Sequence, residues 1–302
     1  MNPKITQQQI ETNGISLNVA LAGPADGQPV VLLHGFPEYW GAWQAHMSLL
    51  ADAGYRVIAP DQRGYGGSSA PAAVKEYAID TLALDVVGLL DSLGHPTAHI
   101  VGHDWGGAVA WQVARCAEDR IDRVVVINCP PIDCVPRTIR RDPLQILQSW
   151  YILFFQLPWL PQWVLSWFGQ AALRWQMTSS SRPGTFDDGK LDGHQAQWQR
   201  PGRLRGMVHW YRCIFRHPSQ HRGPVRRPAL LLWGDKDRFL RTSLIDLTQD
   251  VCDNLEVVRF PDNTHWLPHE EPQRVVAQMR RFFSAASPQE GAMMAQPPPT
   301  TE

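Results

Sequence analysis

The feature that most constrains the fold is a glycine-rich turn, Gly102-His103-Asp104-Trp105-Gly106-Gly107, between two apolar runs. The first run, Ala98 to Val101, is typical of a buried strand, and the second, Ala108 to Ala117, is typical of a helix. A strand that turns at once into a helix leaves little room for side chains, which favours glycine beside the turning residue. The pattern is that of a nucleophile elbow, usually G-x-S-x-G, with Asp104 in place of the serine.

An aspartate at such a turn favours one kind of chemistry. Its carboxylate is ionised at neutral pH, because the ordinary pKa is about 3.9, and it needs no neighbouring base before it attacks carbon. The product of that attack is an ester, so the reaction suits saturated carbons that carry a strained or good leaving group. Epoxides and alkyl halides meet this requirement, whereas amides and ordinary esters do not. The plainer alternative is that Asp104 only caps the following helix.

Strand-like and helix-like runs alternate along most of the chain. The Asn13-Gly14 pair, between two alternating segments, predicts a hairpin. The runs that predict further strands are 29–33, 55–61, 98–101, 123–128, 228–233 and 255–260, and those that predict helices are 77–94, 108–117, 242–251 and 272–283. This alternation predicts an α/β fold with a mostly parallel, doubly wound sheet.

The pattern changes near Cys134 and resumes near residue 226. The segment between contains seven of the 13 tryptophans and no strand-like run, so we interpret it as a helical cap inserted after the sixth strand. We expect the tryptophans to form mainly the core of this cap, and the polar stretch 179–205 to form loops. The predicted domains are therefore a core of residues 1–133 and 226–286 and a cap of residues 134–225. A proline-rich disordered tail of residues 287–302 follows.

Two acidic residues and a histidine follow the last two predicted strands. Asp235 and Asp237 come directly after the run that ends at Trp233, and His265 comes after the next strand. Open α/β sheets bind ligands beyond the carboxyl ends of their strands, so we predict that His265 is catalytic. The spacing does not distinguish Asp235 from Asp237 as its partner. We expect His269, four residues further on, to lie at the surface.

Composition excludes several other classes of protein. The net charge of −1 gives no reason to expect nucleic acid as a partner. The five cysteines are odd in number and lack C-x-x-C spacing, so we predict neither a disulfide framework nor a metal site, and a reducing, cytoplasmic location. The polar first 14 residues do not resemble a signal peptide, and we expect no integral membrane segment. A homodimer stays open.

Taken together, the motifs resemble the epoxide hydrolases of the α/β-hydrolase superfamily. The matching segments, between Val31 and Phe283, are His34-Gly35-Phe36-Pro37-Glu38, Asp61-Gln62-Arg63-Gly64-Tyr65-Gly66, the turn at 102–107, Gly234-Asp235-Lys236-Asp237 and His265-Trp266. The resemblance implies that Asp104 is the nucleophile and that Asp237, the second aspartate, orients His265. It also implies an oxyanion hole made by the backbone N–H groups of Phe36 and Trp105. One departure is Thr264, where many members have glycine.

The resemblance also assigns a role to two cap tyrosines. Tyr151 opens a Tyr-x-x-x-Phe-Gln pattern and Tyr211 lies in Trp-Tyr-Arg. A phenol, with a pKa of about 10, can protonate the oxygen of an opening epoxide, whereas a halide leaves without a proton. The predicted reaction therefore converts an apolar epoxide and water into a vicinal diol, through an ester of Asp104 and without a metal or organic cofactor.

Aromatic residues of the cap and of the motifs predict an apolar substrate site. The residues expected to contact substrate are Phe36, Trp105, Phe154, Phe155, Trp210 and Trp266, and Trp150, Trp159 and Trp163 add to the apolar character of the cap.

Two other functions stay open. Haloalkane dehalogenases share the aspartate and Trp105, but many of them carry asparagine where this chain has Phe36. A non-catalytic ligand-binding protein of the same fold is the second alternative. Such proteins often lose part of the set of nucleophile, acid and base, which is complete here.

Overall fold

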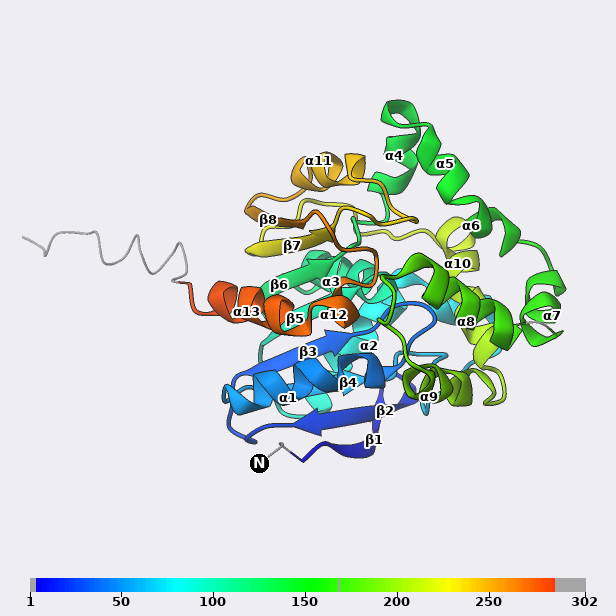
Figure 1. Ribbon diagram of the computed structural model, residues 1–302. Helices are drawn as coiled ribbons and strands as arrows, with labels where there is room; N and C mark the ends of the chain where they lie inside the picture. Colours follow the sequence, from blue (N-terminus) through cyan, green and yellow to red (C-terminus); the bar gives the residue numbers. More distant parts are fainter. Residues whose placement is uncertain (1–3, 168, 286–302) are drawn as a thin grey trace, which may run out of the picture.

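A computed structural model describes residues 4–167 and 169–285 of the chain (Figure 1). Its centre is an eight-stranded sheet with the strand order β1-β2-β4-β3-β5-β6-β7-β8. β1 pairs antiparallel with β2 and β2 antiparallel with β4, and all the other pairs are parallel. The strands are β1 (Thr6–Thr12), β2 (Ile15–Ala22), β3 (Pro29–Leu33), β4 (Arg56–Pro60), β5 (Ala98–His103), β6 (Ile121–Ile127), β7 (Ala229–Gly234) and β8 (Leu255–Phe260). The predicted α/β fold with a mostly parallel sheet and the predicted hairpin are confirmed.

Helices cover both faces of the sheet. On one face lie α1 (Gln44–Asp52), α12 (Leu267–Glu270) and α13 (Pro272–Phe283), and on the other lie α2 (Ile79–Ser92), α3 (Trp105–Cys116) and α11 (Ser243–Gln249). Because side chains alternate along a strand, Val30 and Leu32 of β3 pack with the first group, and Val31 and Leu33 pack with the second. The sheet is therefore buried on both faces, which explains the uninterrupted apolar character of β3.

In the described residues between β6 and β7 there are seven helical segments, as the sequence predicted for an insertion after the sixth strand. They are α4 (Cys134–Arg141), α5 (Leu144–Gln148), α6 (Trp150–Phe154), α7 (Leu160–Trp167), α8 (Gly169–Ser180), α9 (Asp188–Trp198) and α10 (Arg203–Arg216). Short 3-10 helices occur at η1 (Trp40–Trp43), η2 (Val74–Tyr77) and η3 (Glu118–Arg120). We call α4–α10 the inserted helices. They extend along one end of the sheet (Figure 1).

The interpretation of residues 179–205 as loops is wrong, because this stretch contains α9. The Asp187 side chain caps α9 by accepting a hydrogen bond from the backbone N–H of Lys190 at 2.8 Å. Leu191, His194 and Trp198 lie buried on one face of the helix. Polar residues on the other face conceal this spacing when the sequence is read alone.

The interpretation of the cap tryptophans as core is also wrong for most of them. Trp150, Trp159, Trp163 and Trp175 are exposed, whereas Trp198 and Trp210 are buried. The helices α5, α6 and α7 run along the outer edge of the molecule (Figure 1), so their outward sides have no other described element to pack against. Within the described residues, every helix is too short or too polar to cross a membrane. The predicted tail, residues 287–302, lies outside the described residues.

Candidate active site

The glycine-rich turn forms a strained corner between β5 and α3. Asp104 has φ of 50° and ψ of −122°, a conformation that a residue with a side chain rarely adopts. A Cβ atom on Gly102 would overlap the carbonyl oxygen of Gly106, and one on Gly106 would overlap the carbonyl oxygen of Leu33. The predicted steric role of these glycines is confirmed. Their absence of side chains lets β5, α3 and β3 meet closely around Asp104.

The structure brings together Asp104, His265 and Asp237, which come from three separate loops. The Nε2 atom of His265 lies 3.5 Å from Oδ2 of Asp104, and its Nδ1 atom lies 2.7 Å from Oδ2 of Asp237. The side chains of His265 and Asp237 are buried, and the Asp104 side chain is only slightly exposed. The imidazole therefore lies between two carboxylates, with one ring nitrogen directed at each.

Burial and charge act in opposite directions on this group of residues. Burial lowers the pKa of His265, but the negative charge of Asp237 and the hydrogen bond with Asp104 prevail and raise the pKa to about 10. Burial raises the pKa of Asp104, yet the hydrogen bond and the charge of His265 outweigh it and hold that pKa below its usual value. In the resting site, His265 is therefore protonated and Asp104 is ionised at neutral pH.

Asp237 is fixed by hydrogen bonds to both of its oxygens. Oδ1 accepts from the backbone N–H groups of Phe239 and Leu240, at 2.7 and 3.0 Å. Oδ2 accepts from the side-chain amide of Asn128 at 2.8 Å, as well as from His265. Asp235 instead pairs with Arg259 on the surface at 2.9 Å, so the structure separates the two aspartates that spacing alone left equal.

Asn128 is a site residue that the sequence did not reveal. It has φ of 46°, follows β6 directly, and also accepts a hydrogen bond from the backbone N–H of Gly234 through Oδ1 at 2.9 Å. An asparagine immediately after a buried strand was the available signal, because asparagine tolerates positive φ and can bond neighbouring loops.

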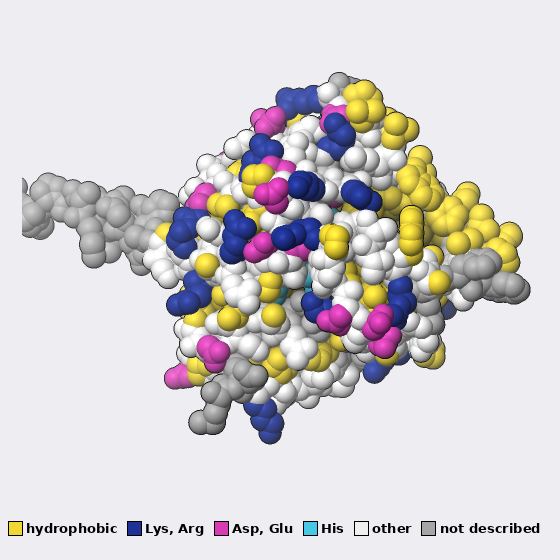
Figure 2. All heavy atoms as spheres, in the orientation of Figure 1, with side chains coloured by type: hydrophobic (Ala, Val, Ile, Leu, Met, Phe, Trp, Pro, Cys, Tyr) yellow, Lys and Arg dark blue, Asp and Glu magenta, His cyan; other side chains and the backbone are white. Residues whose placement is uncertain are grey.

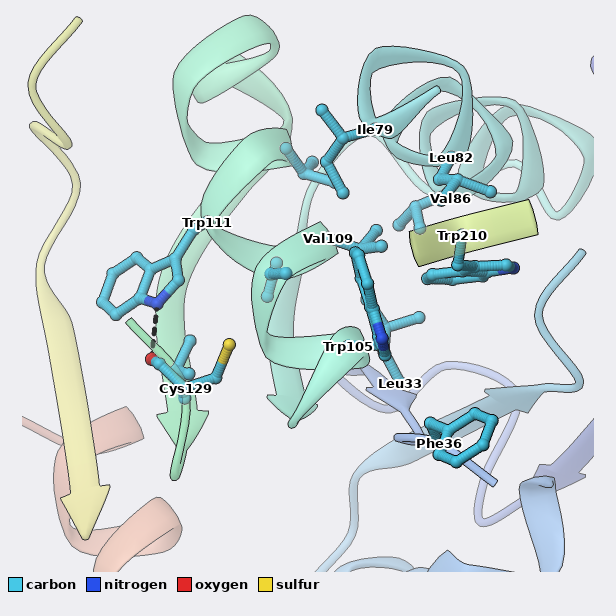
Figure 3. Close-up of a cluster of buried hydrophobic side chains, with 14 of the residues drawn as sticks. Leu33, Phe36, Ile79, Leu82, Val86, Trp105, Val109, Trp111, Cys129 and Trp210 are labelled. Atoms are coloured by element: carbon cyan, nitrogen blue, oxygen red, sulfur yellow. Dashed lines mark hydrogen bonds between the residues drawn. The ribbon is translucent and has the colours of Figure 1, made fainter. Parts of the chain in front are cut away.

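Phe36 and Trp105 lie on either side of Asp104. The backbone N–H of Phe36 donates to Oδ1 of Asp104 at 2.9 Å. Trp105 is the first residue of α3, where backbone N–H groups have no partner within the helix. Figure 3 shows the Trp105 ring between Val109 and Phe36, with Trp210 beside it. These positions are compatible with the two N–H donors expected from the sequence.

Both predicted tyrosines share a cavity with Asp104. The cavity has a volume of about 230 Å³, and its wall includes Asp104, Tyr151 from α6 and Tyr211 from α10. The two phenol rings lie 5.9 Å apart between centroids, and the ring of Tyr211 lies 5.0 Å from that of Trp105. Burial, together with the nearby charge of Asp104, raises the pKa of both tyrosines, so both phenols keep their protons at neutral pH.

The rest of the cavity wall is almost entirely apolar. Besides Asp104, the two tyrosines and Trp105, the wall is formed mainly by aliphatic and aromatic side chains of the β6–α4 loop and the inserted helices. Examples are Ile132, Val135, Ile146, Leu153, Ile214 and Phe215. Ser149 and Gln145 are the other polar residues of this wall in the described chain. The aliphatic residues were not predicted, since nothing in an inserted segment of this composition distinguishes a cavity wall from packing.

Of the six aromatic residues expected to contact substrate, Trp105 is the one that lines this cavity. Phe36 lies outside the cavity wall and packs against Tyr211, at 5.4 Å between ring centroids. The indole N–H of Trp210 donates to the carbonyl oxygen of Arg63, and that of Trp266 donates to Oγ of Ser180. Phe154 and Phe155 pack against each other at 5.8 Å between ring centroids and also lie outside the cavity wall.

A second cavity, of about 250 Å³, shares Trp105, Ile132, Pro136, Ile214 and Phe215 with the first.

A buried group of ionisable side chains contacts the backbone of His265. Glu38 accepts hydrogen bonds from His103 at 3.1 Å, from His269 at 2.5 Å and from the backbone N–H of Gly35 at 3.1 Å. Nε2 of His103 in turn donates to the carbonyl oxygen of His265 at 2.8 Å. The expectation that His269 lies at the surface is therefore wrong, because the fold of α12 directs its ring inward to Glu38. Burial raises the pKa of Glu38, but the two histidines outweigh it and hold the pKa well below its usual value.

No group of three or more histidine, cysteine, aspartate or glutamate side chains in residues 4–167 and 169–285 is arranged to hold a metal ion.

Comparison with known proteins identifies the family. The family model described as alpha/beta hydrolase fold matches residues 28–272. The chain is 39% identical over 270 residues to the AB hydrolase superfamily protein YfhM of Bacillus subtilis, covering 88% of this chain and 93% of that protein. It is 32% identical over 318 residues to Epoxide hydrolase A of Mycobacterium tuberculosis, covering 92% and 97% of the two chains.

Among solved structures, the crystal structure of Epoxide Hydrolase A from Mycobacterium thermoresistibile superposes with a TM-score of 0.84 at 31% identity. The match covers 94% of this chain and 99% of that one. The eight-stranded, mostly parallel sheet agrees with these likenesses. The chain belongs to the epoxide hydrolase family of the α/β-hydrolase superfamily.

Proposed function

We propose that this protein is an epoxide hydrolase that opens an apolar epoxide to a vicinal diol through an ester of Asp104. The observation that carries the proposal is one apolar cavity whose wall holds the Asp104 carboxylate together with the phenols of Tyr151 and Tyr211. A nucleophile and two proton donors around one apolar space meet the needs of an epoxide, which must be attacked at carbon and protonated at oxygen. The names of the related proteins support the same substrate class.

In the first step, an oxygen of Asp104 attacks one ring carbon of the epoxide. The bond between that carbon and the ring oxygen breaks, and its electron pair stays on the oxygen. Tyr151 and Tyr211 hydrogen-bond this oxygen, and one of them transfers its proton to it. The products are an alkyl ester of Asp104, a new hydroxyl group and one tyrosinate.

In the second step, the protonated His265 first gives its proton to the tyrosinate, which leaves the imidazole neutral. The neutral His265 then removes a proton from water, and the resulting hydroxide attacks the ester carbonyl of Asp104. The backbone N–H groups of Phe36 and Trp105 stabilise the oxyanion, and one such donor contributes roughly 2.7–4 kcal/mol. The ester bond breaks, the diol leaves with the proton of the added hydroxyl, and Asp104 is again a carboxylate. His265 keeps the proton that it took from water, so the site returns to its resting state and the cycle consumes one water.

The charge on Asp104 gives His265 a state suited to each step. The carboxylate favours a protonated imidazole before attack. Esterification removes that negative charge, which lowers the pKa of His265 and prepares it to act as a base. Asp237 accepts a hydrogen bond from Nδ1 of His265, so that Nε2 faces the ester.

The two alternative functions are weaker on the same observations. A halide leaving group has no use for two phenols beside the nucleophile, and Phe36 offers only a backbone N–H where many dehalogenases carry asparagine. A binding protein has no need of a complete set of nucleophile, base and acid. We also propose that α4–α10 act as a cap domain, with residues 134–225 as its extent. All five cysteines are free, which favours a reducing, cytoplasmic location.

The two-step scheme predicts that a His265→Gln variant forms the ester but hydrolyses it very slowly. The test is intact-protein mass spectrometry after incubation with an epoxide such as styrene oxide. We expect a mass increase equal to that of the epoxide, and we expect an Asp104→Asn variant to show none.

Diol formation from aromatic and fatty epoxides, measured beside halide release from bromoalkanes, separates the candidate functions. An unmodified His265→Gln protein with wild-type turnover would remove Asp104 from its role. Thermal stabilisation by epoxides without any diol would favour a binding protein.

A further inference from the structure

The inserted helices carry an exposed apolar surface that the proposed catalysis does not use. Residues 143–173, which form α5, α6, α7 and the start of α8, contain no charged side chain. Figure 2 shows a continuous apolar area over the part of the molecule in which Figure 1 places α5–α7. Its described members are Leu147, Trp150, Leu153, Leu157, Trp159 and Trp163, all exposed. We call this area the Trp150 face.

The most exposed members project largely into solvent. Leu147, Trp150 and Trp159 expose 69%, 63% and 73% of their surface. A soluble protein rarely leaves a contiguous apolar area of this kind uncovered unless it meets a partner or a membrane. Tryptophan is the side chain most typical of a membrane surface, because its ring is apolar and its N–H can bond the lipid headgroups.

The cavity that holds Asp104 opens beside the Trp150 face. Ile146, Leu153 and Phe215 each line the cavity and are also exposed, so they form its mouth. Leu153 belongs to both the mouth and the Trp150 face. A rigid protein docked on this face would cover the mouth and hinder exchange of substrate and product. A fluid lipid surface would leave the path open to molecules dissolved in it.

The charged residues next to the Trp150 face leave an excess of positive charge. The nearby carboxylates are neutralised within the protein, since Asp133 pairs with Arg115 at 2.8 Å and Asp142 pairs with Arg241 at 2.5 Å. Near this face, Arg137 within α4, Arg216 at the end of α10 and Arg222, which shares a cavity wall with Phe215, make no ion pair with a described residue. Arg216 reaches the carbonyl oxygen of Gln156 at 3.2 Å, which places it beside Leu157. Unpaired arginines at the border of an apolar face complement an anionic lipid headgroup layer.

We propose that the Trp150 face docks on an anionic membrane surface, with its tryptophans in the headgroup region and the mouth of the cavity facing the lipid. Apolar molecules concentrate in the bilayer, so docking would let the cavity take its substrate from lipid rather than from water. This second part rests on the proposed function, whereas the docking itself does not.

The docking is tested by co-sedimentation of the full chain with large vesicles. The vesicles contain either phosphatidylcholine alone or an equimolar mixture of phosphatidylcholine and phosphatidylglycerol. We expect the protein to pellet with the mixed vesicles and to partition at least about tenfold less in a Leu147→Gln/Trp150→Gln/Trp159→Asn variant. Asparagine is chosen at Trp159 because the backbone there has φ of 46°. An Arg137→Gln variant should bind about fivefold more weakly than the wild type.

Leu84→Gln is the matched control, because Leu84 is half exposed on α2, in the core fold rather than the inserted helices. It should bind vesicles like the wild type, and thermal melts should show that all variants are folded. Protein that stays in solution with the mixed vesicles would overturn the proposal, as would a triple variant that binds like the wild type. Self-association that the triple substitution abolishes, without vesicle binding, would assign the face to a second copy of the chain.

Substrate delivery is tested with one epoxide dissolved in the vesicles and another dissolved in water. We expect the triple variant to convert the water-soluble epoxide at the wild-type rate and the lipid-dissolved epoxide several-fold more slowly. Equal rates on the lipid-dissolved epoxide would overturn delivery from the membrane. Because vesicle binding is measured without substrate, failure of the proposed function, seen as no diol from any epoxide, is distinguishable from failure of docking.

Discussion

His265 lies between two carboxylates of which, in the proposed reaction, only one keeps its charge. Asp237 is held by two backbone N–H groups and by Asn128, and it has no part in bond making. Asp104 loses its negative charge when it becomes an ester. The pKa of His265 therefore depends on whether Asp104 is a free carboxylate or an ester. This dependence follows from the short distance between the two side chains and needs no conformational change.

An Asp104→Asn substitution imitates this loss of charge. Because the charge of Asp104 helps to raise the pKa of His265 to about 10, we expect the pKa of His265 to fall in the variant. Nitrogen-15 NMR of the imidazole, followed across a pH titration, measures the change directly. The deprotonated imidazole is the base, so hydrolysis of a preformed ester should become faster as the pH rises through this lower pKa. An unchanged titration would mean that Asp104 has little influence on His265.

The two cavity phenols should matter for ring opening rather than for ester hydrolysis. We expect Tyr151→Phe and Tyr211→Phe each to slow ester formation roughly 10²–10⁴-fold, since the ring oxygen loses a hydrogen-bond and proton donor. Single-turnover measurements of ester formation, by quenched-flow mass analysis, separate this step from hydrolysis. Tyr55→Phe is the control, because Tyr55 packs against Phe283 on the other side of the sheet, at 5.7 Å between ring centroids.

At this scale, the sequence predicted the residues whose signals are local. Asp104 lies within one short turn, and His265 follows a strand directly. The choice between Asp235 and Asp237 could not be made from spacing, because it depends on which carboxylate the loop after β7 turns inward. Glu38 and His269 were beyond prediction for a related reason, since they are 231 positions apart in the chain and meet only in the folded structure.

At the scale of secondary structure, the elbow depends on close contact between backbones. Gly106 lies so near the carbonyl oxygens of Leu33 and His34 that any side chain would force β3 and α3 apart. We expect Gly106→Ala to lower the free energy of unfolding by about 3 kcal/mol or more, measured by chemical denaturation. Gly223→Ala is the matched control, since a Cβ there meets nothing within 4 Å, and it should change stability by less than about 0.5 kcal/mol. Equal stability of the two variants would contradict the close contact.

Most elements of the sheet and of its covering helices were predicted to within a few residues, whereas α1 and α12 were not predicted. Their apolar periodicity reflects burial on one or both faces, as in β3 and α13. The inserted helices were predicted only as a class. Their apolar residues face both the cavity and the solvent. The spacing of apolar residues in the sequence therefore could not distinguish cavity-lining, core and surface positions. Leu153, which is exposed and also lines the cavity, illustrates the difficulty.

At the scale of the whole molecule, hydrogen bonds from two buried indoles connect the inserted helices to loops of the sheet. The indole N–H of Trp198 in α9 donates to the carbonyl oxygen of Pro37 at 2.6 Å, and that of Trp210 in α10 donates to the carbonyl oxygen of Arg63 at 2.9 Å. The acceptors belong to the loops after β3 and β4, which also border the site. Trp210 precedes Tyr211 in α10. The hydrogen bond of Trp210 therefore helps to set the position of the Tyr211 phenol relative to Asp104.

A Trp198→Phe substitution should loosen this attachment. The ring still packs, but the buried carbonyl of Pro37 loses its donor, at a cost of about 1–3 kcal/mol. We expect faster hydrogen exchange in α9, with the strands of the sheet unchanged. Trp175→Phe is the control, because Trp175 is exposed on α8. Equal exchange in both variants would show that the indole hydrogen bond does not hold the insertion in place.

The hydrogen bond from the Phe36 backbone to Oδ1 of Asp104 makes the two carboxylate oxygens unequal. Oδ1 is already bound to the donor that an oxyanion would need, while Oδ2 faces His265. In the proposed reaction, Oδ2 becomes the bridging atom of the ester and departs with the diol, and the solvent oxygen replaces it. A single turnover in isotopically heavy water should therefore yield an unlabelled diol and a labelled enzyme. The protein would give up one of its own atoms at each cycle and recover it from the solvent.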